Sequence, residues 1–569
     1  NTTASGNTAV GHQSLTANTT GASNAALGQL AMCSNTTGDA NTAVGRLSLA
    51  ANTTADFNTA LGYAALRCNI TGEGNTGLGL CSLFANTTAS YNTAVGYFAL
   101  CANTTGIQNS ALGTSALRQN TDGDFNTAIG YVSQTSNTTG ACNTAVGYNS
   151  NRSNQTGVAN SALGMNTLYA NTGDRNTAIG TCALCKNTTA DENSAIGFLS
   201  LFNNTTGTAN VAVGVCSLKS NTTASNNTAV GYDSLETNTT GIENVAVGTC
   251  SLNANTTACR NTAIGFCSLD ANSTGISNTA VGRMSLYSNT IGGVNTAVGV
   301  VSLGLNTEGC CNTALGYASL YANTTGSNNT AVGFDSMECN TTASNNTAVG
   351  YLSLAANTTG TCNTAVGKSA LATNVTGVNL TAVGYNALLN STGDSNTSVG
   401  FNSMCVNSSG SSNVAVGGNA LCSNTTASDN TAVGTAALKA NTTGASNTAV
   451  GRCSLTANTT GSDNTAVGGE ALTANTTGAN NTSIGKNSML GNTEGASNTA
   501  LGNNALQCNT TADNNTAVGR CSLRSNTTGA NNTALGCITL RDNTTGANNV
   551  AVGNSALRSN VTGSCNTAL

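Results

Sequence analysis

The 22 cysteines are the residues of this chain with the widest range of possible reactions. A thiol can form disulfides, bind metals or act as a nucleophile. Each falls at a variable place in a 17-residue pattern that repeats along the sequence. Cys250 and Cys267 are 17 residues apart, and so are Cys405 and Cys422. If residues 17 apart stack about 4.8 Å from one another, each pair lies within disulfide range. The spacing therefore predicts disulfides between neighbouring repeats.

Two further pairs and several single cysteines complete this prediction. Cys521 and Cys537 fall one place apart in neighbouring repeats, whereas Cys182 and Cys185 belong to one repeat. Buried structural cysteines favour a core, so cysteines at variable places indicate disulfides and an oxidising location. Other cysteines have no obvious neighbour and are candidates for free thiols or for links between chains, among them Cys142, Cys362, Cys453 and Cys565.

Catalytic and metal chemistry are not expected. His12 is the only histidine, no two Cys-x-x-Cys pairs occur together, and the acidic residues are scattered. The many Gly-x-x-Ser stretches lack the Gly-Lys-Ser/Thr ending of a phosphate loop. The sequence therefore predicts no enzyme, no metal site and no cofactor.

Asn-Thr-Thr sequons recur in most repeats, as at Asn18 and Asn35. A glycan on every repeat would crowd its neighbours about 4.8 Å away, so we interpret most of these asparagines as structural. Occupancy of any sequon requires a eukaryotic secretory source. Better candidates for glycosylation lie at a variable place, each in Asn-Asn-Thr: Asn226, Asn328, Asn345, Asn480, Asn514 and Asn531.

The elements that position these residues follow from the repeat N-T-A-V-G-x-x-S-L-x-x-N-T-T-G-x-x, whose places we number 1 to 17 from Asn7 to Ser23. The pattern continues along the 569 residues with two one-residue deletions, before Asn176 and before Asn396. Position 5 is glycine in every complete copy, which indicates positive φ or a backbone approach that no Cβ allows. Charges avoid positions 1–5, 8, 9 and 12, so the variable positions form the solvated surface.

The period and the composition together predict an all-β fold. A 17-residue repeat is too short for a helical hairpin, its glycines and asparagines disfavour a single helix, and the chain has no proline. We predict a β-solenoid, a β-helix or β-roll, of about 33 coils. Each coil has a strand at positions 2–4, a turn at the glycine, a second strand near 8–10 and a return through 12–15. Residues 1–569 are expected to form one continuous array, a section of a longer chain.

Stacking of such coils aligns equivalent residues in ladders. Val10, Leu27 and Val44 at position 4 are expected to form one apolar ladder, and Leu15 and Leu49 at position 9 another. Asparagine is assigned to position 12 in every copy, and with position 1 it forms internal or turn-locking polar ladders, as at Asn18 and Asn35. The free energy gained by burying two apolar side chains per coil does not offset the entropy cost of ordering 17 residues. Backbone and asparagine ladders, cross-links or lateral association must therefore add stability.

The pattern breaks twice in succession at position 9, where Gln134 and Asn151 replace leucine in adjacent coils. One interpretation is a tolerated polar pair that shares amide hydrogen bonds. The other is a local bend or a docking point.

The pattern Asn-Thr-Ala-Val-Gly-Tyr-x-Ser/Ala-Leu-x-x-Asn-Thr-Thr-Gly resembles repeats of bacterial and phage tail-fibre-like proteins along the whole chain. More distantly, Asn-Thr-Ala-Val-Gly is similar to the Ser-Val-Ala-Ile-Gly unit of trimeric autotransporter adhesin heads, which are β-rolls with a shorter repeat. Both resemblances imply an extracellular fibre. The cysteine content also fits secreted filaments of eukaryotic microorganisms.

The function expected is that of a structural, filament-forming extracellular fibre that provides length and stiffness and self-associates into filaments or bundles. Two alternatives remain open, the shaft of an adhesive or receptor-binding fibre and an ice-binding protein. The location expected is extracellular, or the surface of a cell or virion. With 17 basic and 22 acidic residues and no basic run, nucleic acid is not an expected partner. No apolar run approaches 18 residues, so no membrane span is expected.

Overall fold

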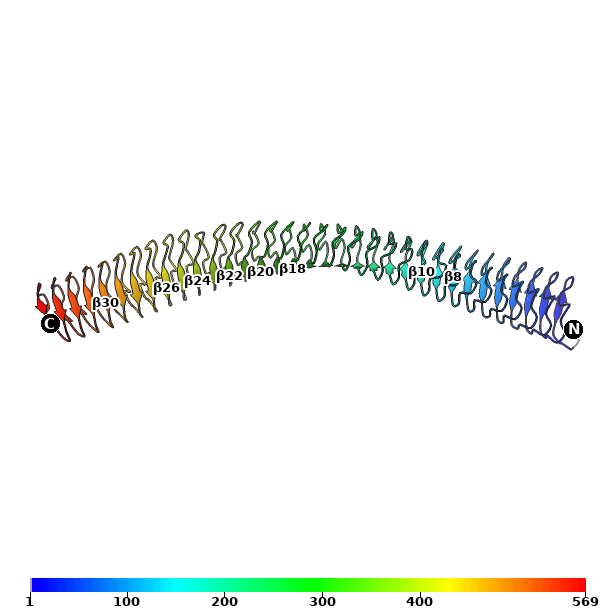
Figure 1. Cartoon of the computed structure of the whole chain (residues 1–569), viewed down its shortest axis with the longest axis horizontal. Helices are drawn as coiled ribbons and strands as arrows, with labels where there is room; N and C mark the ends of the chain where they lie inside the picture. The colour runs from blue at the N-terminus through cyan, green and yellow to red at the C-terminus, as the bar shows by residue number, and fades with distance from the viewer. Residues whose placement is uncertain (1–2) are drawn as a thin grey trace. The chain divides into compact units, whose positions relative to one another are not determined.

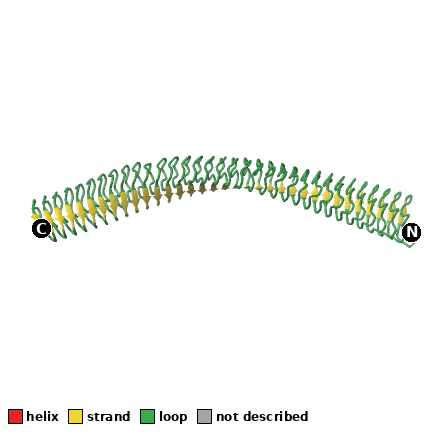
Figure 2. Ribbon diagram, in the orientation of Figure 1, coloured by secondary structure: helices red, strands yellow, loops and turns green. Residues whose placement is uncertain are grey.

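The chain divides into two units, Asn1–Met284 and Ser285–Leu569, of which the computed structural model describes residues 3–569. Each unit is a stack of coils with one short strand per coil (Figure 1), three residues long in all but the last strand, and the strands of each unit form a single stripe (Figure 2). The predicted fold class is confirmed: a parallel, all-β solenoid of about 33 turns with a 17-residue repeat. Residues 3–569 include no helix, and hence none long and apolar enough to cross a membrane.

The strands follow positions 2–4 of the repeat, as predicted. The first unit contains β1 (Thr8–Val10), β2 (Ala25–Leu27), β3 (Thr42–Val44), β4 (Thr59–Leu61), β5 (Thr76–Leu78), β6 (Thr93–Val95), β7 (Ser110–Leu112), β8 (Thr127–Ile129), β9 (Thr144–Val146), β10 (Ser161–Leu163), β11 (Thr177–Ile179), β12 (Ser194–Ile196), β13 (Val211–Val213), β14 (Thr228–Val230), β15 (Val245–Val247), β16 (Thr262–Ile264) and β17 (Thr279–Val281). The second unit contains β18 (Thr296–Val298), β19 (Thr313–Leu315), β20 (Thr330–Val332), β21 (Thr347–Val349), β22 (Thr364–Val366), β23 (Thr381–Val383), β24 (Thr397–Val399), β25 (Val414–Val416), β26 (Thr431–Val433), β27 (Thr448–Val450), β28 (Thr465–Val467), β29 (Thr482–Ile484), β30 (Thr499–Leu501), β31 (Thr516–Val518), β32 (Thr533–Leu535), β33 (Val550–Val552) and β34 (Thr567–Ala568).

Neighbouring strands within each unit pair in parallel and in register, so residues at the same position stack. Thr8 pairs with Ala25 and Val10 with Leu27. The hydrogen bonds between coils continue beyond the strands: the N–H of Leu15, at position 9, donates to the carbonyl of Ala31 at 3.1 Å. Much of the turn backbone is therefore also paired from coil to coil, which satisfies groups that would otherwise be buried without partners.

The two shortened coils keep this register. Ser161 pairs with Thr177 and Thr381 with Thr397, so each one-residue deletion is absorbed within the return segment after the leucine. In the second shortened coil Ser391 fills the buried position 12, where its hydroxyl accepts from Asn407 Nδ2 at 3.2 Å. The assignment of asparagine to position 12 in every copy is wrong for this coil.

The invariant glycine at position 5 has both features that its invariance predicted, a positive φ and a backbone approach that leaves no room for a Cβ. Gly11 has a φ of 133°, and a Cβ built on it would lie 2.6 Å from the carbonyl oxygen of Gly28 in the next coil.

The predicted second strand near positions 8–10 is wrong. Gln13 and Leu15, at positions 7 and 9, have φ of 58° and 50°, so the chain turns where an extended strand was expected.

The core of each coil is narrow and contains one large apolar side chain. Leu15, Met32 and Leu49 stack inside, with the alanine of position 3 and the serine or alanine of position 8 around them. The position-4 ladder predicted to share this core is instead on the outside. Val10 and Leu27 are aligned in one column, as expected, but are 55% and 49% exposed. In a three-residue strand only the middle side chain points inward, and position 3 takes that place.

Both asparagine ladders are internal, as predicted. At position 12, Asn35 Nδ2 donates to Asn18 Oδ1 at 2.8 Å and to the carbonyl of Gly38 at 3.0 Å. At position 1, the backbone N–H of Asn41 donates to Asn24 Oδ1 at 2.8 Å, and Asn24 Nδ2 donates to Gly38 O at 2.7 Å. The carbonyl at position 15 therefore ties the two ladders together inside each coil.

The polar pair at position 9 does not share hydrogen bonds. Gln134 Nε2 donates to Asn126 Oδ1 at 3.1 Å, but the side-chain amide of Asn151 has no hydrogen-bond partner although it is fully buried. The interpretation of a shared amide bond is wrong, because the amide of Gln134 donates to Asn126 and not to Asn151. The asparagine ladder is interrupted at the same level: Asn154 Nδ2 donates to Gly157 O and has no bond to Asn137.

Candidate functional site

The broadest candidate site is the outer face of the strands, which we call the sheet face and define as positions 2 and 4 of the repeat. Position 2 is mostly threonine and position 4 is Val, Leu or Ile. Side chains at both positions are half-buried or exposed, while position 3 points inward. The register stacks like residues at intervals of about 4.8 Å, so each unit presents a column of hydroxyls beside a column of aliphatic groups.

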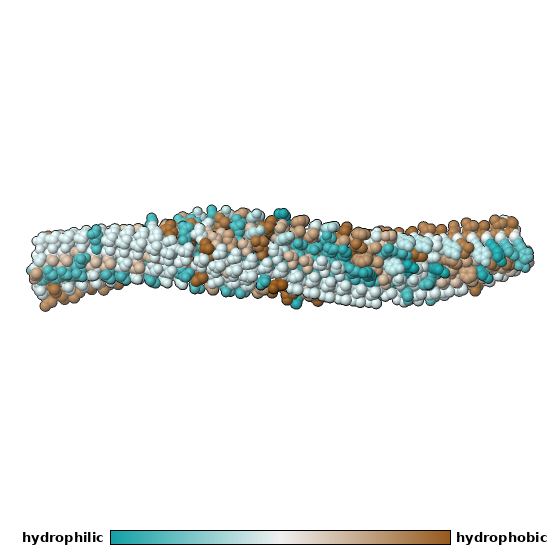
Figure 3. All heavy atoms as spheres, turned by 90° about the horizontal axis from the view of Figure 1, so that it is seen from above, coloured by the Kyte–Doolittle hydropathy of each residue, from teal (hydrophilic) through white to brown (hydrophobic). Residues whose placement is uncertain are grey.

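No charged side chain lies on this sheet face in any of the strands β1–β34. Hydrophobic atoms form rows along the stacked coils in the view of Figure 3. A shallow hollow of about 250 Å³ lies on the sheet face between Val95, Leu112 and Ile129. A continuous column of exposed aliphatic side chains is typical of an interaction surface.

Aromatic residues stack at position 6, just beyond the glycine turn. In the second unit Tyr317, Phe334 and Tyr351 follow one another with ring centroids 5.0 and 5.6 Å apart. Lys368 Nζ then lies 5.7 Å from the rings of both Tyr351 and Tyr385, so an ammonium is held between two aromatic faces. These contacts stabilise neighbouring coils against one another at the surface.

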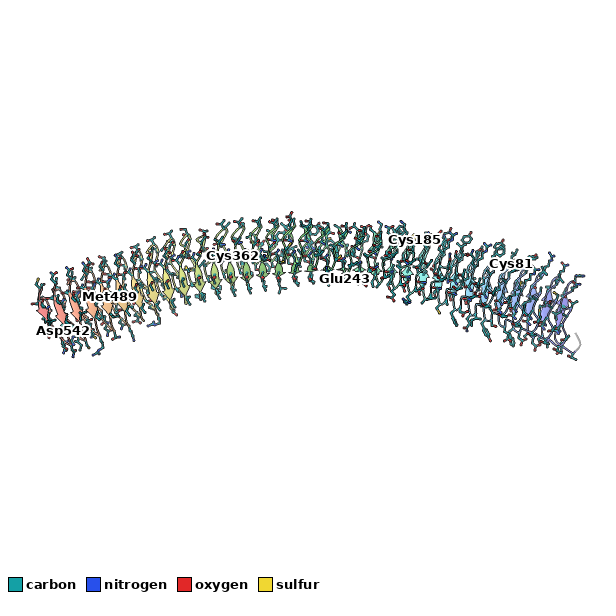
Figure 4. All side chains as sticks on the ribbon, viewed as in Figure 1. Cys81, Cys185, Glu243, Cys362, Met489 and Asp542 are labelled. Carbon is teal, nitrogen blue, oxygen red and sulfur yellow. The ribbon has the colours of Figure 1, made fainter. Side chains whose placement is uncertain are left out.

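The cysteines lie at the surface, as their positions indicated, and all 22 are thiols in the structure. Figure 4 shows Cys81 and Cys185 on the outside of the coils. In one predicted pair, Cys405 and Cys422, the two sulfurs are 3.3 Å apart. Burial and the neighbouring thiol of Cys422 raise the pKa of Cys405 to about 12.

Two other predicted pairs are also brought together. Burial, and then Asp270 and Cys250, raise the pKa of Cys267 to about 11. Burial and the thiol of Cys182 raise the pKa of Cys185 to about 11. No thiol contact links the fourth pair, Cys521 and Cys537, although both lie within the described residues and are half-buried.

Four of the cysteines predicted to lack a neighbour are accessible. Cys142, Cys362 and Cys565 are exposed, and Cys453 is half-buried. The glycosylation candidates Asn226, Asn328, Asn345, Asn480, Asn514 and Asn531 are all exposed. By contrast, the sequon asparagines Asn18 and Asn35 are buried within the ladder.

One cluster was missed by the sequence reasoning. The thiol of Cys216, a carboxylate oxygen of Asp233 and one of Glu236 lie within 4.8 Å of one another. Lys219 Nζ lies 3.0 Å from Glu236 Oε1. Cys216 and Asp233 occupy position 7 of adjacent coils, and Glu236 follows at position 10. A comparison of acidic residues as well as cysteines at equivalent positions of neighbouring coils would have predicted this cluster.

Burial raises the pKa of the Cys216 thiol, with Asp233 and Glu236 adding to the rise and Lys219 opposing it. Burial and the Glu236 carboxylate likewise raise the pKa of Asp233. The cluster therefore holds more negative charge than its one lysine balances. Comparison with known proteins adds no parallel for this arrangement: no protein-family model matches the chain, and no curated protein sequence matches it.

Proposed function

We propose that this chain is a structural fibre protein that works outside the cell and forms filaments or bundles by lateral association of its sheet faces. The observation that carries the proposal is the uncharged ladder of threonine and aliphatic side chains on β1–β34. A rigid stack with an apolar outer column fits a role in length and stiffness.

The area of the sheet face supports the proposal. Burying the outward half of one aliphatic side chain removes on the order of 40 Å² of apolar surface from water. Seventeen strands in one unit thus offer on the order of 700 Å² before the threonines are counted, close to the roughly 800 Å² that each partner buries in a stable interface. Charged residues, which resist burial in an interface core, are absent from the strands.

The test compares two triple variants that add the same charge to the same three coils. Leu501→Lys, Val518→Lys and Leu535→Lys place lysines on the sheet face, whereas Asn514→Lys, Asn531→Lys and Asn548→Lys place them at exposed position 17. Sedimentation velocity and negative-stain electron microscopy of protein made without glycans measure association. The first variant is expected to lose lateral assemblies and the second to keep them. Equal assembly by both variants would reject the sheet face as the interface.

Ice binding is a second candidate, because the structure provides a threonine column that the paired threonines of the repeat did not suggest. Position 2 lies on the outer side of the sheet face, as at Thr330, Thr347 and Thr364, where side chains repeat at about 4.8 Å on a regular sheet. A thermal hysteresis assay on dispersed protein separates this role from lateral association. Absence of hysteresis removes the candidate.

A further inference from the structure

The cluster of Cys216, Asp233 and Glu236 has the ligand set of a small metal site. We propose that these three side chains bind one divalent transition-metal ion of the zinc type, with water completing a four-coordinate shell. The proposal is independent of filament formation. It rests on one thiol and two carboxylates whose ligand atoms already lie within 4.8 Å of one another.

The distances require little movement. Zinc binds thiolate at about 2.3 Å and carboxylate oxygen at about 2.1 Å, so two ligands of one tetrahedral ion are about 3.6 Å apart. Side-chain rotations at the half-buried surface can close a separation of 4.8 Å to that value. The backbone does not need to change, because the N–H of Asp233 donates to the carbonyl of Val215, the residue before Cys216, at 3.1 Å and so holds the two coils together at this place.

The charges favour a divalent ion. With Cys216 as thiolate, the two carboxylates and the ammonium of Lys219 leave a net charge of about −2. A carboxylate has two oxygens, so Glu236 can pair with Lys219 through Oε1 and offer the other oxygen to the ion. A bound M²⁺ therefore neutralises the cluster. A thiolate among the ligands favours zinc, and cobalt as its spectroscopic substitute, over magnesium or calcium.

Binding must displace the thiol proton: Cys–SH and M²⁺ give Cys–S⁻–M²⁺ and H⁺. The groups that face Cys216 are Lys219, Asp233 and Glu236, and Tyr232 and Cys250 lie beside Asp233. One proton is released for each ion bound, so binding is expected to strengthen as the pH rises.

The same chain contains a matched site without the thiol. Asp335 and Glu338 occupy positions 7 and 10 of one coil, just as Asp233 and Glu236 do, but the preceding coil has Ala318 where Cys216 would stand. A hollow of about 520 Å³ adjoins Ala318, Asp335 and Glu338. The substitution Ala318→Cys therefore builds the proposed ligand set in the second unit.

The experiment titrates Co²⁺ into the reduced full-length chain and follows the near-ultraviolet sulfur-to-cobalt charge-transfer absorption. Cys216→Ser is expected to remove one equivalent of this signal, and Glu236→Gln to weaken binding by about tenfold or more. Cys453→Ser, a thiol at position 7 without the paired carboxylates, controls for cobalt bound elsewhere and is expected to keep the Cys216 signal. Circular dichroism checks that each variant is folded.

Ala318→Cys gives an independent readout, since it is expected to add one equivalent of the same absorption. Identical titrations of the wild type and Cys216→Ser would overturn the proposal. So would loss of signal in Cys216→Ser together with unchanged affinity in Glu236→Gln, since the thiol would then bind cobalt without the carboxylates.

Discussion

Asn509 Nδ2 donates to Asn492 Oδ1 at 2.7 Å while Asn509 Oδ1 accepts from Asn526 Nδ2 at 3.0 Å, so this asparagine of the ladder is both donor and acceptor between coils. Asn509 Nδ2 also donates to the carbonyl of Ala512. Every buried amide atom of this residue thus has a partner, and the ladder locks the return of the chain into the next coil.

Loss of one asparagine from this ladder is expected to destabilise the solenoid. Asn509→Ala removes three hydrogen bonds and leaves the Oδ1 of Asn492 without its donor, at a cost of about 2–4 kcal/mol. Asn503→Ala, at the exposed position 6 of the same coil, is the control and should change the free energy of unfolding by less than about 0.5 kcal/mol. Guanidinium denaturation followed by circular dichroism measures both. Equal midpoints for the two variants would contradict the ladder's role.

The two aliphatic columns should differ sharply in their contribution to stability. Leu438 is fully buried at position 9, and Leu438→Ala is expected to cost about 2–5 kcal/mol. Val433, at position 4 of the same coil, is 36% exposed, and Val433→Ala should cost less than about 1 kcal/mol in dispersed protein. Thermal unfolding at low protein concentration makes the comparison. Similar losses of stability in both variants would show that Val433 is buried in a core, which would contradict its exposure in the structure.

The repeat determined the stacking but not the direction of each side chain. Register, the strand at 2–4 and the buried asparagines follow from spacing alone, because residues 17 apart must meet when coils stack. The spacing does not predict that Val10 points outward or that Leu15 has the αL conformation. A regular column of apolar residues is compatible with a buried core and equally with an exposed interface. Predicting the cluster of Cys216, Asp233 and Glu236 would have required a comparison of the positions of acidic residues in adjacent coils, which composition does not reveal.

Oxidation should cross-link Cys405 and Cys422 before any other pair. Their sulfurs are 3.3 Å apart and need to approach to about 2.05 Å. With oxidised glutathione, two protein thiols would give one protein disulfide and two molecules of reduced glutathione. Because the pKa of Cys405 is raised to about 12, its thiolate is scarce at neutral pH. The rate through Cys405 should therefore increase by about tenfold per pH unit between pH 7 and 9.

Peptide mass spectrometry after alkylation measures this cross-link as the loss of two hydrogens from the linked peptides. Cys362, which is exposed and has no adjacent thiol, provides the comparison and should form only a mixed disulfide with glutathione. A rate that levels off within this pH range would show that the attacking thiolate is not that of Cys405. Failure to link the pair under conditions that modify Cys362 would contradict the geometry.

Glycosylation in a eukaryotic secretory host should follow exposure. The asparagines at position 17, such as Asn226 and Asn345, are exposed, whereas the position-12 sequons such as Asn35 are buried and hydrogen-bonded on both sides. A glycan on Asn35 would remove a donor from the ladder and force a polar chain into the core. Glycopeptide mass spectrometry of folded, secreted protein is expected to find occupancy at position 17 and none at position 12. Asn226→Gln should remove one glycan without affecting secretion, while occupied Asn35 in folded protein would refute the internal ladder.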